Sequence, residues 1–227
     1  MALGGQSARA KRNTMKIYVI RHAEAIEKGM VADELRHLTS EGRAFFRRVC
    51  RHFDHKGMSV DLILSSPLVR AVQTAEILAA RLGFEGEVAA VPELAEMLDR
   101  EQLASLLARW PEARKVALVG HEPYLGKLVG ELVGRDAGFV FEKGAGIALS
   151  YAPDRASSTF RWYIAGKKKV TDLENLFRGE GEERPPVRKR CGKCKKFPSP
   201  PEAAVAAVPP AAPLPAAAMT EGDPIIV

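Results

Sequence analysis

A chain of 227 residues, 46% of them hydrophobic, can bury the core of one domain and still leave residues at its ends. The formal net charge of +6 is concentrated outside the middle of the chain. Residues 184–196 hold seven basic side chains and no acidic one, while residues 15–183 are close to neutral. Three cysteines are too few for a disulfide framework, and no apolar run approaches the roughly 18–20 residues of a membrane-spanning helix. The composition therefore excludes a small disulfide-rich protein and a protein with helical membrane spans.

Composition also divides the chain into three parts. We expect a flexible basic leader at 1–14, one folded domain at 15–183, and a disordered tail at 184–227 that is first basic and then rich in proline and alanine. The leader has no apolar stretch and so does not resemble a secretory signal, which favours a cytoplasmic protein. Its basic residues without acidic ones leave an organelle transit peptide as the alternative.

The first predicted element is a strand at 16–20. Its uninterrupted apolar run indicates burial on both faces, and it ends at Arg21 and His22. A polar loop through residues 23–38 leads to a helix that starts at Thr39–Glu41, where a hydroxyl suited to the N-cap is followed by an acidic side chain.

A second strand is expected at 60–64, followed by a helix that starts at Ser65–Pro67 with proline at its first helical position. The other expected strands are 87–91, 116–119, 147–151 and 159–164, and the other expected helices are 100–109, 123–133 and a short one near 170–178. Strands that alternate with helices predict an α/β fold, in the form of a three-layer α/β/α sandwich with a mainly parallel central sheet.

Reactive side chains cluster where three of these strands end. Arg21 and His22 follow the first strand, Ser65–Arg70 follows the second, and His121 follows the strand at 116–119. Because ligands gather at the carboxyl ends of parallel strands, one edge of the sheet would hold two arginines, two histidines and a helix N-terminus. Arginine forks and helix N-termini both bind phosphate, and an imidazole nitrogen can attack phosphorus. These residues therefore predict a site for phosphoryl chemistry.

The same residues resemble the motifs of a known family. Arg21–Glu24 (Arg-His-Ala-Glu) resembles the Arg-His-Gly motif of the histidine phosphatase superfamily, which has the phosphoglycerate mutase-like fold. Leu64–Ala75 resembles the second motif of that family and Val119–Pro123 the third. The short length, Ala23 and the sequence Leu35–Thr39 are most similar to the SixA-type phosphohistidine phosphatases.

The resemblance, which covers roughly residues 15–166, implies a role for each matching residue. It implies His22 as the phosphorylated nucleophile, Arg21 and Arg70 as phosphate clamps, Arg36 as a further pocket arginine, and His121 as the second histidine that contacts the transferring phosphoryl group. Two positions depart from the family pattern. Ala23 replaces the glycine of the first motif, and His37 stands where a proline often follows the pocket arginine.

The general acid is not identified by the sequence. Glu24 lies beside the proposed nucleophile, and Glu96 follows the second motif with Glu93 and Asp99, so Glu24 and Glu96 are candidates on proximity. The resemblance implies that SixA-type proteins lack the usual acid, which fits a phosphoramidate substrate whose nitrogen leaves readily once protonated. We expect no cofactor and no metal, because no carboxylate cluster suggests a metal site.

We therefore predict a metal-independent phosphatase, a hydrolase of phosphoric monoesters or phosphoramidates, that works through a phosphohistidine intermediate. The leading substrate is phosphohistidine on a partner protein. One alternative is a small phosphometabolite or polyphosphate, and another is a non-catalytic phosphate-binding or interaction protein. His22 and His121 argue against the last, because arginines would be enough for binding alone. We expect a monomer with no membrane partner.

The predicted tail contains one further motif. Cys191 and Cys194 resemble half of a zinc knuckle, but a structural zinc needs four ligands and no histidine follows His121. A redox or intermolecular role of these cysteines stays open. The basic run 184–196 leaves contact with nucleic acid, acidic protein or polyphosphate as an alternative to a merely solvated tail, which we expect.

Overall fold

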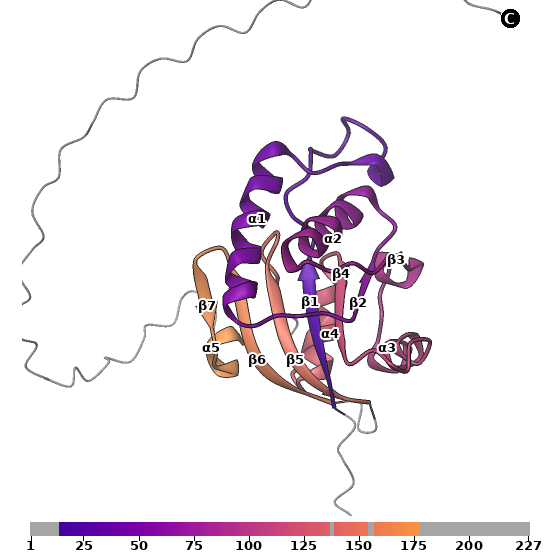
Figure 1. Cartoon of the computed structure of the whole chain (residues 1–227), viewed down its shortest axis with the longest axis vertical. Coiled ribbons are helices and arrows are strands. Elements are labelled where there is room, and N and C mark those ends of the chain that lie inside the picture. Colours follow the sequence, from indigo (N-terminus) through magenta and orange to yellow (C-terminus); the bar gives the residue numbers. More distant parts are fainter. Residues whose placement is uncertain (1–13, 137–138, 154–156, 178–227) are drawn as a thin grey trace, which may run out of the picture. The chain divides into compact units, whose positions relative to one another are not determined.

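The computed structural model describes residues 14–136, 139–153 and 157–177, which form an α/β structure (Figure 1). The predicted leader, apart from Thr14, and the predicted tail with Cys191 and Cys194 lie outside the described residues. The limits of the three predicted parts therefore stay a prediction. Among the helices described, none has the length and apolar character needed to cross a membrane.

Seven strands form one mixed sheet in the order β3-β2-β4-β1-β5-β6-β7. Their bounds are β1 Met15–Arg21, β2 Leu62–Ser65, β3 Val88–Ala90, β4 Lys115–Gly120, β5 Gly146–Ala152, β6 Ser157–Ala165 and β7 Lys168–Val170. The first four strands in this order pair in parallel, and the pairs β1–β5, β5–β6 and β6–β7 are antiparallel. Short connections, such as the one between β6 and β7, allow only antiparallel pairing, whereas parallel neighbours need a long crossover. The predicted fold class is confirmed, and its sheet is more mixed than predicted.

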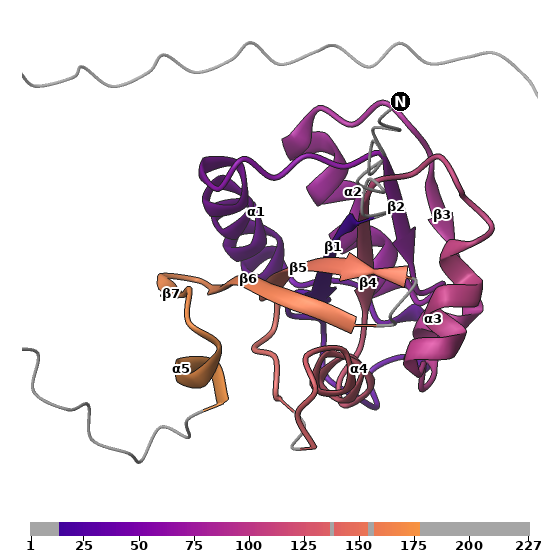
Figure 2. The same ribbon diagram turned by 90° about the horizontal axis from the view of Figure 1, so that it is seen from below.

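Helices cover both faces of this sheet (Figure 2). One face carries α1 Ser40–His55 and α2 Val69–Leu82, and the other carries α3 Arg100–Leu107, α4 Tyr124–Leu132 and α5 Leu173–Phe177. The side chains of β1 alternate between the two cores, with Ile17 and Val19 in one and Tyr18 and Ile20 in the other. This alternation explains why the first strand is apolar at every position: both of its faces are buried.

Two helix starts differ from the prediction. α2 begins at Val69 with Leu68 as its N-cap, so the expected start with Pro67 at the first helical position is wrong. The physical reason is a turn after β2, in which Ser66 Oγ accepts the Leu68 N–H at 3.3 Å. The short helix expected near 170–178 begins only at Leu173, because β7 extends the sheet through the preceding residues.

Two short 3-10 helices occupy segments that were expected to be loops. They are η1, Asp33–Leu35, and η2, Pro92–Ala95. η2 packs closely on the end of β4, since the Leu94 carbonyl oxygen lies 3.0 Å from where a Cβ on Gly120 would be. η2 therefore adjoins the edge of the sheet at which the parallel strands end.

Candidate active site

The carboxyl ends of β1, β2 and β4 meet at one edge of the sheet. In the parallel pairing of β1 with β4, Arg21 lies opposite Gly120, so the next residues, His22 and His121, come side by side. Their ring centroids are 5.0 Å apart. Ser66 follows β2 at the same edge, and its Oγ lies 2.8 Å from Nε2 of His121. Three segments far apart in the chain thus contribute to one site.

The backbone of His22 is held from two sides. Its N–H donates to the Gly120 carbonyl at 3.0 Å, and its own carbonyl accepts the N–H of Gly144 at 3.0 Å. Gly144 has φ of 70°, in the left-handed region that favours glycine. These contacts anchor the base of the imidazole side chain between β4 and the segment that leads into β5.

The His22 ring has a defined tautomer. Its Nδ1 lies 2.6 Å from the Ala23 carbonyl oxygen, and a carbonyl can only accept, so Nδ1 carries the proton and Nε2 carries a lone pair. Burial lowers the pKa of His22 to about 3 and outweighs the Ala23 hydrogen bond, which acts in the other direction; the neighbouring His121 and arginines lower it further. At neutral pH the ring is therefore an uncharged imidazole with a free Nε2 electron pair.

His121 is the second buried imidazole. Burial lowers its pKa to about 4, with further lowering by the charges of Arg70 and Arg21 and an opposing effect of Asp33. Ser66 Oγ accepts from the Leu68 backbone and can turn its hydrogen toward Nε2 of His121. In that arrangement the proton of His121 sits on Nδ1, which makes Nδ1 a hydrogen-bond donor.

Arg21 and Arg70 each use some of their guanidinium nitrogens in hydrogen bonds within the protein and leave one buried nitrogen unpaired among the described residues. Nη1 of Arg21 donates to the Phe141 carbonyl at 2.6 Å, and Arg70 donates to Asp33 through Nη1 and Nη2. Among the described residues, three buried nitrogens of this site find no hydrogen-bond partner: Nε of Arg21, Nε of Arg70 and Nδ1 of His121. Buried polar groups are costly when unpaired, and the oxygens of a tetrahedral anion would pair all three.

Arg36 reaches the same cluster through Asp33, a residue that the sequence did not single out. Arg36 Nε donates to the Ile26 carbonyl at 2.9 Å, and its Nη1 donates to Asp33 Oδ1 at 2.9 Å. The hydrogen bond from Arg36 lowers the pKa of Asp33, and Arg70 adds to this effect, so the carboxyl group is ionised at neutral pH. The only sequence signal for Asp33 was its place three positions before Arg36, the arginine that the resemblance implies in the pocket.

Two polar residues of α2 tie the segments together. Thr74 Oγ1 accepts the Ala23 N–H at 3.1 Å and donates to the Arg70 carbonyl at 2.7 Å. Gln73 Oε1 accepts the N–H of Leu38 at 2.8 Å, at the end of the segment that carries Arg36. The polar residues that follow the arginine in the second motif thus fix the first motif and the preceding loop against α2.

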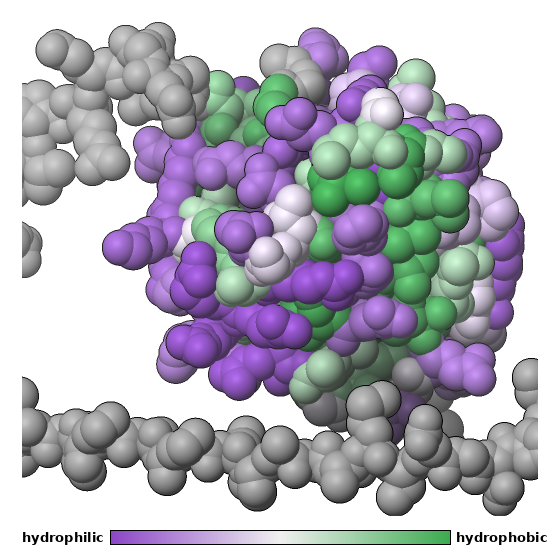
Figure 3. Space-filling view, turned by 90° about the horizontal axis from the view of Figure 1, so that it is seen from above, coloured by the Kyte–Doolittle hydropathy of each residue, from purple (hydrophilic) through white to green (hydrophobic). Residues whose placement is uncertain are grey.

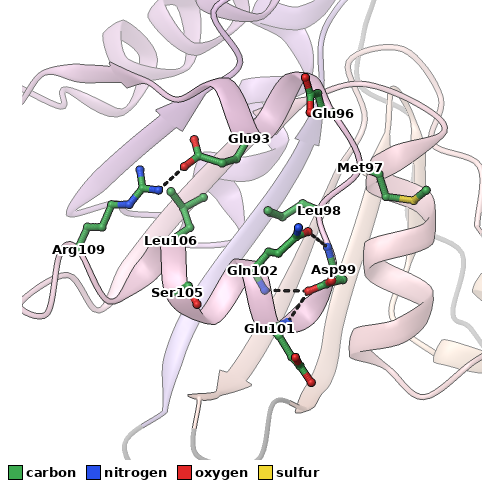
Figure 4. A pocket seen from close by; sticks show the side chains of 10 residues that line it. All are labelled: Glu93, Glu96, Met97, Leu98, Asp99, Glu101, Gln102, Ser105, Leu106 and Arg109. Atoms are coloured by element: carbon green, nitrogen blue, oxygen red, sulfur yellow. Dashed lines mark hydrogen bonds and ion pairs between the residues drawn. The ribbon is translucent and has the colours of Figure 1, made fainter.

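Neither of the two candidate acids is buried at the site. Glu24 pairs with Lys143 at 3.2 Å, and both side chains are about half exposed. Glu96 is exposed, and in Figure 4 it points away from Asp99. No hydrogen bond to His22 is found for either glutamate within the described part of the chain.

Glu122 is a half-buried residue that the sequence did not single out. Burial raises its pKa, while the backbone N–H of Phe141 and the charge of Arg21 act in the opposite direction. Its Oε1 is buried and has no partner among the described residues. The Glu122 carboxylate therefore accepts from the Phe141 N–H, while Arg21 donates to the Phe141 carbonyl oxygen. Its position directly after His121 was the only signal available in the sequence.

A separate cavity of about 460 Å³ lies along η2 and α3 (Figure 4). Its charged lining is mostly acidic, with Glu93, Glu96, Asp99, Glu101 and the single basic residue Arg109. Asp99 caps α3 together with Gln102, and Glu93 pairs with Arg109. Carboxylates that repel anions and already serve the local structure make this cavity unsuited to a phosphoryl group.

Among the described residues, histidine, cysteine, aspartate and glutamate side chains form no group of three or more that could hold a metal ion. The charges gathered at the sheet edge are instead the guanidinium groups of Arg21, Arg36 and Arg70. Their fixed positive charge and directional donors suit an oxyanion.

Comparison with known proteins gives this geometry a context. Residues 17–117 match the model of the histidine phosphatase superfamily, branch 1. An uncharacterised protein of Picosynechococcus is 38% identical over 120 residues, which cover 50% of this chain and 70% of that protein. The phosphohistidine phosphatase SixA of Escherichia coli is 26% identical over 153 residues, which cover 66% of this chain and 94% of SixA.

Solved structures agree with these relatives. The structure of the protein histidine phosphatase SixA complexed with tungstate has a TM-score of 0.61 and 25% identity, covering 67% of this chain and 97% of that one. Phosphatases of small metabolites share the fold at 20% identity or below, which is a likeness of fold alone. The chain belongs to the histidine phosphatase superfamily, resembles its SixA-type members, and is a phosphatase.

Proposed function

We propose that the protein removes phosphoryl groups from its substrate by hydrolysis, through a covalent intermediate on His22 and without a metal. The observation that carries this proposal is the neutral His22 ring, whose Nε2 lone pair stands among the cationic groups of Arg21 and Arg70. Such a nitrogen can attack phosphorus, and the arginines can stabilise the negative charge of the equatorial oxygens.

The reaction has two balanced steps. Nε2 of His22 forms a bond to phosphorus as the bond from phosphorus to the leaving group breaks, and the leaving group takes up a proton. Water then attacks the phosphorus, releases inorganic phosphate and restores the neutral imidazole. His121, through Nδ1, is suited to donate a hydrogen bond to a phosphoryl oxygen in both steps. The proton donor stays unassigned, with Glu24 and Glu96 as candidates.

We propose phosphohistidine on a partner protein as the substrate. The similarity to SixA, a phosphohistidine phosphatase by name, is the first support. A phosphoramidate also asks less of a general acid, because its nitrogen is basic enough to be protonated before it leaves. This fits a site in which neither Glu24 nor Glu96 is bonded to the nucleophile.

Exposed apolar side chains on segments next to the site are the second support. Large hydrophobic residues with high exposure are Met30, Val31, Leu35, Met97 and Val140. Each lies within three residues along the chain of a residue that adjoins the site: Asp33 at Arg70, Leu94 at Gly120, or Phe141 at Arg21. We call these five residues the apolar rim. Figure 3 views the end of the molecule where β1 ends, and green apolar residues gather there beside purple hydrophilic ones.

An apolar rim favours a protein-sized substrate, because exposed apolar groups gathered in one region commonly mark an interaction surface. A small phosphometabolite or polyphosphate is the second candidate substrate, and it is favoured by the fold shared with metabolite phosphatases. The two candidates differ in what they contact: a metabolite would need the arginines and histidines only, whereas a protein would also cover the rim.

A rate comparison tests the proposal. We expect kcat/KM for a phosphohistidine-containing protein to exceed that for each member of a panel of phosphorylated metabolites and polyphosphates. We expect hydrolysis of every substrate to continue in the presence of EDTA. A higher value for one metabolite would replace the protein substrate with that compound. Loss of activity in EDTA, restored by magnesium, would contradict the metal-free mechanism.

A further inference from the structure

Asp33 uses all of its side-chain and carbonyl oxygens on two arginines of the site. Its carbonyl accepts from Arg70 Nη1 at 2.7 Å, its Oδ2 accepts from Arg70 Nη2 at 2.9 Å, and its Oδ1 accepts from Arg36 Nη1 at 2.9 Å. The Asp33 side chain is 49% exposed, whereas the Arg70 side chain is 8% exposed. A carboxylate at the surface therefore holds a buried guanidinium group in place.

Asp33 occupies only one of the two edges of the Arg70 guanidinium group that can bind an oxyanion. A guanidinium group has one edge formed by Nη1 and Nη2 and another formed by Nε and Nη2. Asp33 takes the first edge of Arg70, and Nε on the second edge is buried without a partner in the described part of the chain. The contact thus leaves available the edge that can bind an oxyanion side-on.

Asp33 also lies between two like charges. Arg36 and Arg70 would repel each other in one site, and the carboxylate between them offsets this repulsion. With Arg21 included, three guanidinium groups and one carboxylate leave a net charge of +2, which is the charge that complements a phosphoryl dianion.

We propose that Asp33 is a positioning residue for the phosphoryl group: it orients Arg70 and Arg36 so that their free donors meet the oxygens of the anion. The proposal rests on the proposed role of the two arginines in binding phosphate. Asp33 itself touches only the arginines.

The opposite role for Asp33 makes the opposite prediction. A carboxylate bound to two arginines could instead compete with phosphate, in the way that any anion would. If Asp33 competes with phosphate, removing its charge tightens phosphate binding. The same result is expected if Asp33 is only a nearby negative charge, because the site then attracts anions more strongly. Removing a positioning carboxylate weakens binding, even though the site becomes more positive.

The experiment measures the Kd of inorganic phosphate by isothermal titration calorimetry for the full chain and two variants. Asp33→Asn keeps the shape and the backbone carbonyl, but its amide turns an N–H toward one of the two arginines. Glu34→Gln removes the neighbouring exposed charge, for which no arginine contact is found among the described residues. We expect Asp33→Asn to raise the Kd about tenfold, as the loss of one charge-assisted hydrogen bond does, and Glu34→Gln to leave it within about twofold.

An equal or lower Kd in Asp33→Asn would overturn the proposal and assign Asp33 as a competitor or a bystander. A wild-type chain that binds no phosphate would contradict the proposed function itself, so the two failures are distinguishable. Arg70→Ala provides a further check, because a residue that acts through Arg70 has little left to position there. Asp33→Asn added to Arg70→Ala is therefore expected to raise the Kd by less than it does alone, because only the contact with Arg36 is left to lose, and a further tenfold loss would contradict the proposal.

Discussion

The sheet-edge site and the cavity along η2 and α3 both gather charged side chains, but they differ in whether those charges are already used. In the cavity, Asp99 caps a helix and Glu93 pairs with Arg109. At the sheet edge, buried nitrogens of Arg21, Arg70 and His121 have no partner among the described residues. The size of a hollow therefore says less about chemistry than the hydrogen-bonding capacity left over around it.

The largest effect that this contrast predicts is at His22. His22→Ala should lower turnover by about three orders of magnitude or more, because the attacking atom is lost. After rapid quenching with labelled substrate, the wild-type chain should hold an acid-labile, base-stable phosphoryl group that the variant lacks. A variant that still forms the labelled enzyme would move the nucleophile to another residue.

A matched pair of arginine changes tests the two regions directly. Arg70→Ala should lower kcat/KM by about 100-fold, since it removes a buried donor to the developing negative charge. Arg109→Ala, in the cavity along η2 and α3, should stay within about twofold, because its contact is an exposed ion pair. Equal losses on a generic small phosphoester would mean that the cavity takes part in the reaction.

The two buried histidines predict a pH-dependent stability. Their pKa values, about 3 for His22 and about 4 for His121, lie below the ordinary value of 6.5 that holds in the unfolded chain. Above pH 6.5 both histidines are neutral in the folded and in the unfolded chain. As the pH falls below 6.5, they bind protons in the unfolded chain but stay neutral in the folded chain. Stability should therefore decline toward pH 4, by at most about 1.4 kcal/mol per pH unit for each histidine.

Denaturant titrations between pH 7 and pH 5 measure this decline. His22→Ala removes one of the two buried rings and should make the decline shallower, whatever its effect on stability at pH 7. A decline as steep as in the wild-type chain would mean that the low pKa of His22 does not contribute. Glu34→Gln serves as the control, since its side chain is exposed and lies outside the site.

The smallest effect concerns the apolar rim. Met30→Ser combined with Met97→Ser should lower kcat/KM about fivefold for a phosphohistidine-containing protein and leave a small phosphoester unaffected, because only the protein reaches the rim. A loss of the same size for both substrates would argue against the rim as a docking surface. The replaced side chains are exposed, so folding should be unaffected.

Much of the fold could be predicted because apolar strands that alternate with amphipathic helices leave few ways to build a core. The same logic predicted that His22, Arg70 and His121 would lie together, since all three follow strands that end at one edge. The antiparallel strands β5 to β7 were less predictable, because a continuous apolar run does not reveal the direction of its partner. β7 was missed because its three residues, Lys168–Val170, give no alternation to detect.

Asp33 and Glu122 could not be assigned roles from the sequence for a different reason. Each makes its contact from a segment between a strand and an α-helix: Asp33 with Arg70, 37 residues later, and Glu122 with the backbone of Phe141. Loop paths depend on tertiary packing rather than on local periodicity. A single acidic residue in a polar segment has the same appearance whether it faces water or a buried arginine.

The hydrogen bond from His22 Nδ1 to the Ala23 carbonyl has a consequence for the chemical form of the intermediate. Since the acceptor is a main-chain oxygen, no side-chain substitution can delete it, and the reactive nitrogen is selected by the path of the backbone. The phosphohistidine proposed at His22 would therefore be the positional isomer substituted at Nε2, and not the one substituted at Nδ1. Phosphorus NMR of the trapped species would distinguish that isomer from its Nδ1 counterpart.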